Sequence, residues 1–208
     1  MAETITIPHD AADARTVSHV VLPNRTYDDF TALPEGTLAQ LIDGDIIVSP
    51  APNVKHQLVI SRLSTLFANF VDERRLGVVF GSPLDVRLTL NRVFQPDIVF
   101  VARERLAILG EQEVEGAPDL VVEVLSLSTG TYDLTKKRSA YEEAGVREYW
   151  IVDPDGESVE VLELEERTYQ SSARVQDGGP IGSTLLPGFE IDSAALFATP
   201  GIEGGKES

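Results

Sequence analysis

The residues best suited to chemistry in this sequence are an acid and a lysine carried by two consecutive segments. Glu123 interrupts a valine-rich, almost wholly apolar run, 119–125, of the kind that forms a strand covered on both faces. A carboxylate in such a strand costs several kcal/mol unless a cation or strong donors compensate for it. A helix is predicted from about Asp133, and on it Lys137 shares one face with apolar residues at spacings of three and four. The pattern predicts a buried acid with a lysine turned toward it.

Carboxylates in or beside predicted strands are the candidates for a metal site. They are Asp45, Asp85, Asp97, Asp119 and Glu123. Asp119 and Glu123 lie roughly 13 Å apart along one strand, which is too far to share a cation whose ligands sit ~2.0–2.6 Å from it. Asp97 follows Pro96 at the start of its own predicted strand, and adjacent strands lie only about 5 Å apart. If the two strands are neighbours, Asp97 and Glu123 can converge on one Mg²⁺ or Mn²⁺.

Each of these residues also has a structural interpretation. Asp97 could end a strand or pair with an arginine, and Glu123 with Lys137 could form a buried ion pair that has no catalytic use. His56 lies near the start of a predicted helix, 54–74, on the face that points inward. It could be a partly buried structural histidine or a part of the site.

The order of periodic segments predicts an α/β domain with a mixed β-sheet, helices and β-hairpins. The domain is expected to span 23–198, after a loose N-terminal arm, 1–22, and before a disordered tail, 199–208. Asp43-Gly44 and the turn 153–156 each join two strand-like runs, which is the signal of a hairpin. The predicted helices are a short one capped by Thr26, then 54–74, 133–145 with Asp133 as cap and Gly145 as stop, and a turn at 194–197; the predicted strands are 38–42, 45–48, 78–80, 85–90, 96–101, 119–125, 148–152 and 158–164, with shorter ones in 170–192.

Composition excludes several classes of protein. The 208 residues contain no cysteine, which rules out disulfides and thiolate metal sites and fits a cytoplasmic protein. No apolar run approaches the ~20 residues of a membrane span, and the first twenty residues lack the apolar core of a secretory signal. The net charge of −17 opposes nucleic-acid binding, because such a surface repels phosphate. Basic residues nevertheless cluster, at Arg74-Arg75, at Arg103 and Arg105, and at Lys136-Lys137-Arg138.

Several motifs together resemble those of a known family. They are Pro96-Asp97, the strand ending Glu123-Val124-Leu125-Ser126, Asp133 with Lys137, and the runs Tyr141-Glu142-Glu143-Ala144-Gly145-Val146 and Glu148-Tyr149-Trp150-Ile151-Val152-Asp153-Pro154. In these motifs the chain resembles the Uma-two family, a bacterial family of restriction endonucleases within the PD-(D/E)xK nuclease superfamily. The likeness runs from the region of Tyr27 to Leu196-Phe197 and is most specific over 116–154.

The resemblance implies a restriction-endonuclease-like mixed sheet flanked by helices, with a divalent-metal site on its central strands. Asp97 matches the acid of the PD element, and Glu123 matches the second acid. The superfamily's usual lysine would fall at Leu125, and Lys137 instead matches the lysine that the family places on the following helix. Gln40 stands where the family often has glutamate, so one supporting acid is absent.

We therefore predict a Mg²⁺- or Mn²⁺-dependent endonuclease that hydrolyses phosphodiester bonds in DNA. Asp97, Glu123 and the backbone carbonyl of Val124 would hold the ion. Lys137 would orient the attacking water or stabilise charge on the phosphoryl oxygens. The expected supporting residues are His56, Asp85 and Gln40, and the expected contacts to the DNA backbone are Lys136, Arg138, Arg103 and Arg105. For Lys136 and Arg138, a solvated position is favoured over a functional one.

Two other functions and one assembly stay open. The chain could be a catalytically inactive nuclease-fold module that binds nucleic acid or a protein partner, which the acidic charge favours. It could also be a nuclease that acts on RNA. The apolar hairpin carrying Tyr149, Trp150 and Val152 could cap the core or pair two copies across a two-fold axis, which predicts a homodimer. No membrane partner is expected.

Overall fold

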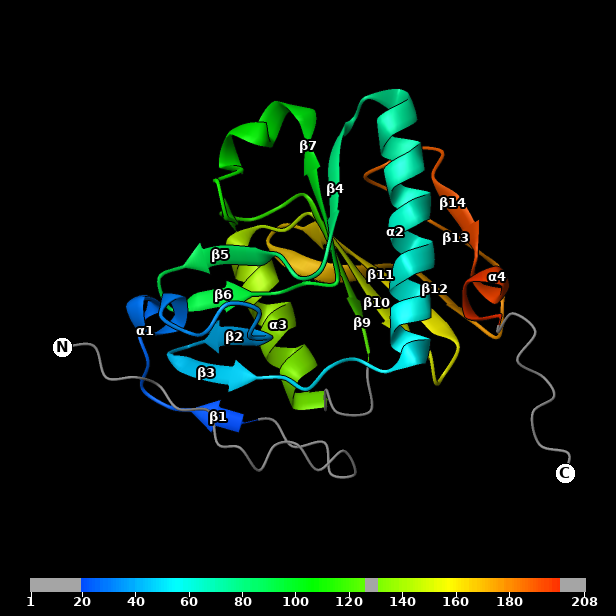
Figure 1. Ribbon diagram of the computed structural model, residues 1–208. Helices are drawn as coiled ribbons and strands as arrows, with labels where there is room; N and C mark the ends of the chain where they lie inside the picture. Colours follow the sequence, from blue (N-terminus) through cyan, green and yellow to red (C-terminus); the bar gives the residue numbers. More distant parts are fainter. Residues whose placement is uncertain (1–19, 126–130, 199–208) are drawn as a thin grey trace, which may run out of the picture.

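Two six-stranded sheets, packed against each other and flanked by helices, form the fold of this chain (Figure 1). The computed structural model describes residues 20–125 and 131–198. A third, two-stranded sheet joins β13 (Pro180–Gly182) and β14 (Glu190–Asp192). The mixed α/β class predicted from the sequence is confirmed, but the strands divide between two large sheets instead of forming one.

The first sheet takes its strands from the N-terminal half of the chain, in the order β1-β3-β2-β6-β5-β8. Neighbouring strands pair antiparallel, except that β5 and β8 run parallel. Asp43 and Gly44 turn β2 into β3 with φ angles of 52° and 87°, which an Asp-Gly turn accommodates easily, so this predicted hairpin is confirmed. The strands are β1 (Val20–Leu22), β2 (Ala39–Ile42), β3 (Asp45–Val48), β5 (Asp85–Thr89), β6 (Arg92–Phe94) and β8 (Glu113–Glu115).

The second sheet is the central one and has the order β12-β11-β10-β9-β7-β4. β9 lies between β7, to which it is antiparallel, and β10, to which it is parallel. All five residues of β9 are buried, as expected for a strand covered on both faces. The strands are β4 (Gly77–Gly81), β7 (Ile98–Ala102), β9 (Leu120–Val124), β10 (Glu148–Asp153), β11 (Ser158–Glu165) and β12 (Thr168–Gln176).

The two faces of the central sheet bury different helices. The even-numbered residues of β9 pack with α2 (Val54–Arg74). Val121 instead packs with side chains of α3 (Thr131–Ala144). Because side chains alternate along a strand, Glu123 shares the α3 side of the sheet with Val121. The sheet therefore presents the acid of β9 to the helix that follows it.

The helices begin and end at local signals. α2 has the bounds that the sequence predicted; Asn53 caps its start by accepting a hydrogen bond from the N–H of His56 at 2.9 Å. Arg75 ends it in the left-handed conformation, with φ of 55°. The other helices are α1 (Tyr27–Thr31), capped by Thr26 as predicted, the 3₁₀ helix η2 (Arg103–Ile108), and α4 (Ser193–Phe197). No helix among the described residues is long and apolar enough to span a membrane.

Three details of the sequence prediction need correction. The arm predicted over 1–22 includes Val20–Leu22, which form β1 because their backbone pairs with β3; its remainder, 1–19, and the predicted tail, 199–208, lie outside the described residues. Asp133, expected to cap α3, lies inside that helix, because the helix begins at Thr131. The last part of the chain was expected to form only short strands, but β12 runs for nine residues because it pairs along the whole length of β11.

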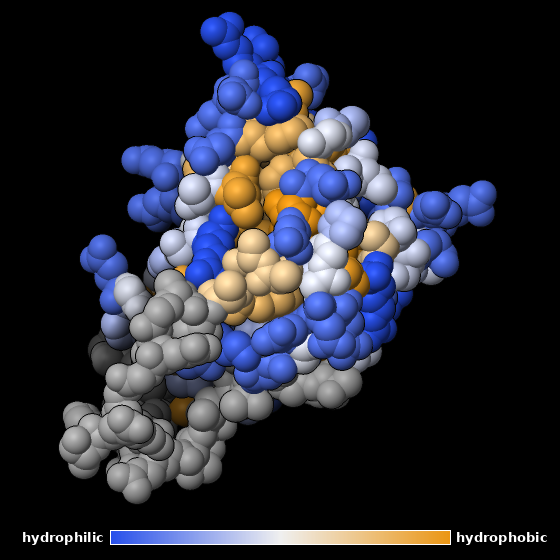
Figure 2. Space-filling model, turned by 90° about the vertical axis from the view of Figure 1, so that its right-hand side faces the viewer, coloured by the Kyte–Doolittle hydropathy of each residue, from blue (hydrophilic) through white to orange (hydrophobic). Residues whose placement is uncertain are grey.

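One face of the molecule, on the side of α2 and α4, shows hydrophobic residues gathered near its middle with hydrophilic residues around them (Figure 2). On α2, the Leu66 side chain is exposed at 43%. The Arg62 guanidinium donates to the carbonyls of Leu196 and Ala198 at 2.7 and 2.5 Å. This arginine is thus engaged in holding the C-terminal helix against α2.

Candidate active site

Glu123 is held at both carboxylate oxygens by side chains of α3. Lys137 Nζ donates to Oε2 at 2.8 Å, and the Tyr141 hydroxyl donates to Oε1 at 2.7 Å. The Glu123 and Lys137 side chains are only 7% and 5% exposed, and Tyr141 is fully buried. The lysine expected to face the acid does so, and a tyrosine that the prediction did not place in the site joins it.

Asp97 lies near Glu123, where the ladder of β7 and β9 ends. Ile98, the first residue of β7, pairs with Val122 in the antiparallel register, so Asp97 comes directly before this ladder. The Asp97 N–H donates to the Val122 carbonyl at 3.1 Å, and its Oδ2 accepts from the Val124 N–H at 2.7 Å. The negative charge of Asp97 acts on Glu123 and raises its pKa, so the two carboxylates nominated from the sequence both lie near the same end of β9.

His56 approaches these strands from the first turn of α2. Its Nε2 lies 2.8 Å from the Val124 carbonyl oxygen and 3.5 Å from Asp97 Oδ2. Its Nδ1 is buried and has no hydrogen-bond partner within the described part of the chain. Burial lowers the pKa of His56, but Asp97, the Val124 carbonyl and the charge of Glu123 outweigh it, and the net pKa is raised. The structure thus brings His56 to the two acids.

Burial gives Glu123 an unusual titration. Burial raises the pKa of this carboxyl from 4.5 to about 7. The charge and hydrogen bond of Lys137 and the hydrogen bond of Tyr141 lower the pKa, whereas the charge of Asp97 raises it further. The pKa of Tyr141 is raised well above its ordinary value, by burial first and by Glu123 next. Tyr141 therefore stays a neutral donor, whereas Glu123 changes charge near neutral pH.

Two carboxylates and one backbone carbonyl are the oxygens available to a cation here. Mg²⁺ binds in proteins through one or two carboxylates and keeps several waters, which the pair Asp97 and Glu123 matches. From the residues that the structure describes, no donor reaches the second Asp97 oxygen, Oδ1. In the same residues, no group of three or more His, Cys, Asp or Glu side chains gathers around a point. The donor set therefore fits a hard, partly hydrated divalent cation and does not fit a closed cage of protein ligands.

The predicted supporting residues Asp85 and Gln40 meet at Gln95. Gln95 Nε2 donates to Asp85 Oδ1 at 2.8 Å, and the Gln95 N–H donates to Gln40 Oε1 at 3.5 Å. Burial raises the pKa of Asp85; the Gln95 hydrogen bond opposes the rise and the charge of Glu113 adds to it. Because Gln95 precedes Asp97 by two residues, these side chains connect to the acid pair through the backbone that leads into β7.

The basic residues predicted to contact DNA come from α3 and from η2. Arg138 Nη2 donates to a backbone carbonyl of β12 at 3.1 Å, and Lys136 is half-buried on the same helix. Arg103 is exposed on η2, whereas Arg105 donates to Asp119 Oδ1 at 3.1 Å. Asp119 precedes β9, at the end of the strand away from Glu123. A role of these four residues in DNA binding stays a prediction.

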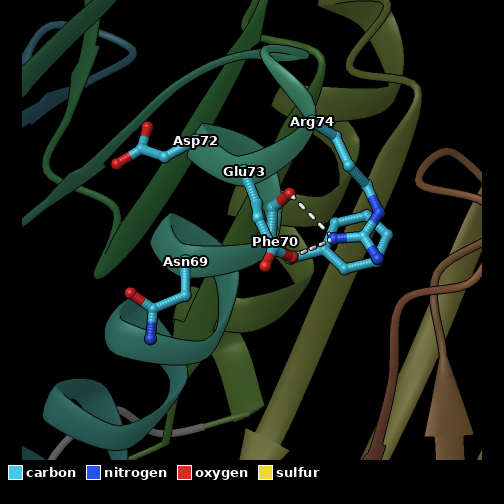
Figure 3. A pocket seen from close by; sticks show the side chains of 5 residues that line it. All are labelled: Asn69, Phe70, Asp72, Glu73 and Arg74. Carbon is cyan, nitrogen blue, oxygen red and sulfur yellow. Dashed lines mark hydrogen bonds and ion pairs between the residues drawn. The ribbon is translucent and has the colours of Figure 1, made fainter.

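Two pockets lie apart from the acid pair. One, of about 540 Å³, is lined by the last turns of α2, where Arg74 lies 3.9 Å from the centroid of the Phe70 ring and pairs with Glu73 at 2.8 Å (Figure 3). The other, of about 910 Å³, lies between α1 and the β5–β8 edge and contains the acids Glu35, Asp85, Glu111, Glu113 and Glu115. Neither pocket is lined by Asp97, Glu123 or Lys137.

Tyr141 and Gln95 are the residues of this neighbourhood that the sequence prediction missed. Tyr141 follows Lys137 by four residues, so it lies one turn further along the same helix face. That spacing places Tyr141 on the buried face of the helix, but it does not reveal that the hydroxyl contacts Glu123. Local sequence carries no signal for Gln95, because its partners come from β2 and β5.

Comparison with known proteins identifies the family and the fold of the chain. No curated protein matches the chain. Among solved structures with a similar fold is one described as "a putative nuclease belonging to DUF820 from Anabaena variabilis ATCC 29413", with a TM-score of 0.69 and 23% identity, covering 83% of this chain and 97% of that one. The sequence model of the Uma2 family, described as "Putative restriction endonuclease", matches residues 27–194. The chain therefore belongs to the Uma2 family, as its motifs predicted.

Proposed function

We propose that this protein is a metal-dependent endonuclease that hydrolyses phosphodiester bonds in DNA. The observation that carries the proposal is that Asp97, just before β7, binds the Glu123 end of β9 through the Val124 N–H and acts on Glu123 by its charge, with Lys137 2.8 Å from the Glu123 carboxylate. Membership of a family described as "Putative restriction endonuclease" supports it. The likeness of the fold to a structure described as "a putative nuclease" agrees with it.

Mg²⁺ or Mn²⁺ would be held by Asp97, Glu123 and the backbone carbonyl of Val124. Such an ion supplies a Lewis acid that polarises the phosphate and lowers the pKa of the attacking water. Lys137 would stabilise the negative charge that develops on the phosphoryl oxygens, because its buried ammonium acts in a site with little water. His56 would hold the Val124 carbonyl and Asp97 in place through its Nε2.

DNA binding by such an acidic chain would depend strongly on salt and on the divalent ion. The net charge of −17 repels phosphate, and solvent ions screen this repulsion beyond about 8 Å at physiological ionic strength. The proposed contacts to the DNA backbone are Lys136, Arg138, Arg103 and Arg105, and Arg105 would contribute least because it donates to Asp119. Such contacts provide affinity without reading the base sequence.

Cleavage of duplex DNA in Mg²⁺ and in Mn²⁺ tests the proposal. Wild type should cut, EDTA should stop it, and Glu123→Ala and Lys137→Ala should each lose more than about 100-fold in rate, since even residues that only orient metal ligands are worth 10–100-fold. Glu73→Ala and Arg74→Ala are matched controls, because these two residues form an exposed ion pair with the same 2.8 Å separation. Equal cleavage by wild type and all four variants would exclude the Glu123 site. Parallel assays on single-stranded DNA and RNA identify the substrate class.

A catalytically inactive module that binds nucleic acid or a protein partner is the second candidate, and burial of the site favours it. The Lys137, Glu123 and Asp97 side chains are 5%, 7% and 13% exposed, respectively. Titration with Mn²⁺, followed by electron paramagnetic resonance, separates the two functions. A nuclease should take up Mn²⁺ at or below millimolar concentration, whereas an inactive module should leave the ion free.

We also expect a homodimer, through a surface other than the second hairpin. Tyr149, Trp150 and Val152 are fully buried within one chain, so that hairpin caps the core. Leu66, on α2, is exposed at 43% and is a candidate contact. Light scattering should give a dimer mass for wild type and a monomer mass for Leu66→Glu. A monomer mass for wild type would refute the dimer.

A further inference from the structure

We propose that Tyr141 is a positioning residue, whose hydroxyl fixes the Glu123 carboxylate in the orientation that binds the divalent cation. The inference rests on the proposed function and extends it to a residue outside the three matched to the family's acids and lysine. Its basis is a buried hydroxyl that donates to one oxygen of Glu123 at 2.7 Å while Lys137 donates to the other at 2.8 Å.

α3 holds the acid with two consecutive turns. Residues four apart on a helix lie on one face, about 5–6 Å apart at Cβ, so Lys137 and Tyr141 reach the same carboxylate together. Each of them donates to a different oxygen of Glu123, which fixes the plane of the carboxylate as well as its position. A lysine alone would leave the carboxylate free to rotate about its last bond.

The two donors leave room for a cation. An ionised carboxylate offers about four lone-pair sites, and Lys137 and Tyr141 occupy one on each oxygen of Glu123. The remaining sites can face Asp97, which lies just before β7, bonds the N–H of the next residue, Val124, and acts on Glu123 by its charge. Tyr141 therefore orients the Glu123 carboxylate from the side away from the cation. Hydrogen-bond partners of ligating carboxylates have this role in metal sites generally.

The aromatic ring of Tyr141 has a packing role that its hydroxyl does not share. The ring lies 5.3 Å from the rings of both Phe94 and Tyr149, and a phenylalanine ring would fill the same space. Tyr169, in the same hydrophobic cluster, donates its hydroxyl to the Val146 carbonyl at 2.8 Å. The two tyrosines thus differ in the acceptor: a candidate metal ligand for Tyr141 and a helix-end carbonyl for Tyr169.

Tyr141→Phe and Tyr169→Phe make the matched test, because each removes one buried hydroxyl and keeps the ring. The affinity of the DNA-free protein for Mn²⁺ is measured by electron paramagnetic resonance, and cleavage is measured as kcat and KM. For Tyr141→Phe we expect Mn²⁺ affinity to fall about 10–100-fold, with kcat reduced and the KM for DNA unchanged. For Tyr169→Phe we expect both quantities within about twofold of wild type, because its effect should be confined to the free energy of unfolding, on the order of 1 kcal/mol.

The outcomes of this test are distinct from those of the proposed function. If wild type binds Mn²⁺ and Tyr141→Phe binds it equally well, the Tyr141 inference is overturned while the nuclease proposal stands. If both variants lose the same affinity, the effect of Tyr141 is general loosening of the cluster, and the inference is again overturned. If wild type itself binds no Mn²⁺ at millimolar concentration, the proposed metal centre fails, and the role of Tyr141 fails with it.

Discussion

Both ends of β9 carry a buried carboxylate, and the charges around the two differ in balance. Asp119, just before the strand, accepts hydrogen bonds from the Ala102 N–H at 2.8 Å, from Arg105 at 3.1 Å and from Arg147 at 3.5 Å. Its side chain is fully buried. One acid beside two guanidinium groups leaves no excess negative charge. The buried carboxylate at this end of β9 is therefore fully paired, as a stable interior requires.

The other end of the strand has the reverse balance. Glu123 has one ammonium partner, Lys137, and one neutral donor, Tyr141, while Asp97 adds a second negative charge across the ladder. Among the described side chains, two carboxylates at this end meet one lysine and one titratable histidine, which lies 3.5 Å from Asp97, so the acids outnumber the permanently charged cations. The difference between the two ends shows that a single buried acid does not by itself indicate a metal site. The uncompensated second acid does, because it gives a divalent cation a place to bind.

The largest expected effect is a difference in DNA cleavage between variants at the two ends of β9. Glu123→Gln should lower DNA cleavage more than about 100-fold, since it removes a proposed ligand and outer partners alone are worth 10–100-fold. Asp119→Asn should leave the rate per folded molecule within about twofold, because the two side chains lie more than 10 Å apart along the strand. Cleavage rates are normalised to the folded fraction from urea unfolding. An equal loss of cleavage rate in both variants would show that the different charge balance at the two ends of β9 does not bear on activity.

Removing one cationic side chain from each end of β9 should lower the free energy of unfolding by different amounts. Lys137→Met should lower the free energy of unfolding at pH 8 by about 3–5 kcal/mol, because it leaves Glu123 buried without a cation. Arg105→Met should cost only about 1 kcal/mol, since Asp119 keeps Arg147 and the backbone N–H and Arg105 is 36% exposed. Urea unfolding monitored by Trp150 fluorescence measures both. Losses of the same size would mean that the charge balance is the same at both ends.

The raised pKa of Glu123 predicts the pH dependence of stability. A folded-state pKa of about 7 against an ordinary 4.5 means that the folded state binds this proton more tightly than the unfolded state does. Its contribution is therefore complete below about pH 4.5 and is lost as pH rises through about 7, by roughly 3 kcal/mol in total. Glu123→Gln lacks this titration, so wild type should lose stability relative to it between pH 5 and pH 8. Parallel stability curves for the two proteins would place the Glu123 pKa near its ordinary value.

The sequence was informative wherever local chemistry decides the structure. The Asp43-Gly44 hairpin follows from its turn residues and the bounds of α2 from its apolar periodicity, and the structure has both as predicted. Glu123 was identifiable because an acid in a valine-rich run demands a partner, and the helical period supplied Lys137. These inferences need only the residues of one or two neighbouring segments.

Properties that depend on distant segments were not predictable in the same way. The pairing of β7 with β9 was a condition of the metal-site prediction, not a result of it, because register between strands depends on the whole sheet. The division into two sheets and the position of Gln95 between Asp85 and Gln40 also depend on tertiary contacts. Tyr141 was placed with the apolar residues of α3, since periodicity reveals which face is buried and does not reveal what a buried hydroxyl contacts.

The smallest expected effect concerns His56, which links α2 to the acidic end of β9. His56→Ala should lower the free energy of unfolding by about 1–2 kcal/mol, because the Val124 carbonyl loses its donor. His56→Gln should recover part of this, since an amide N–H can donate to the same carbonyl. Asn53→Ala is the control for the helix start: it removes the cap, at a cost of ~1 kcal/mol, and leaves the contact to Val124 intact. Urea unfolding measures all three variants; if His56→Gln recovered none of the stability lost in His56→Ala, the histidine would not act through its contact with the Val124 carbonyl.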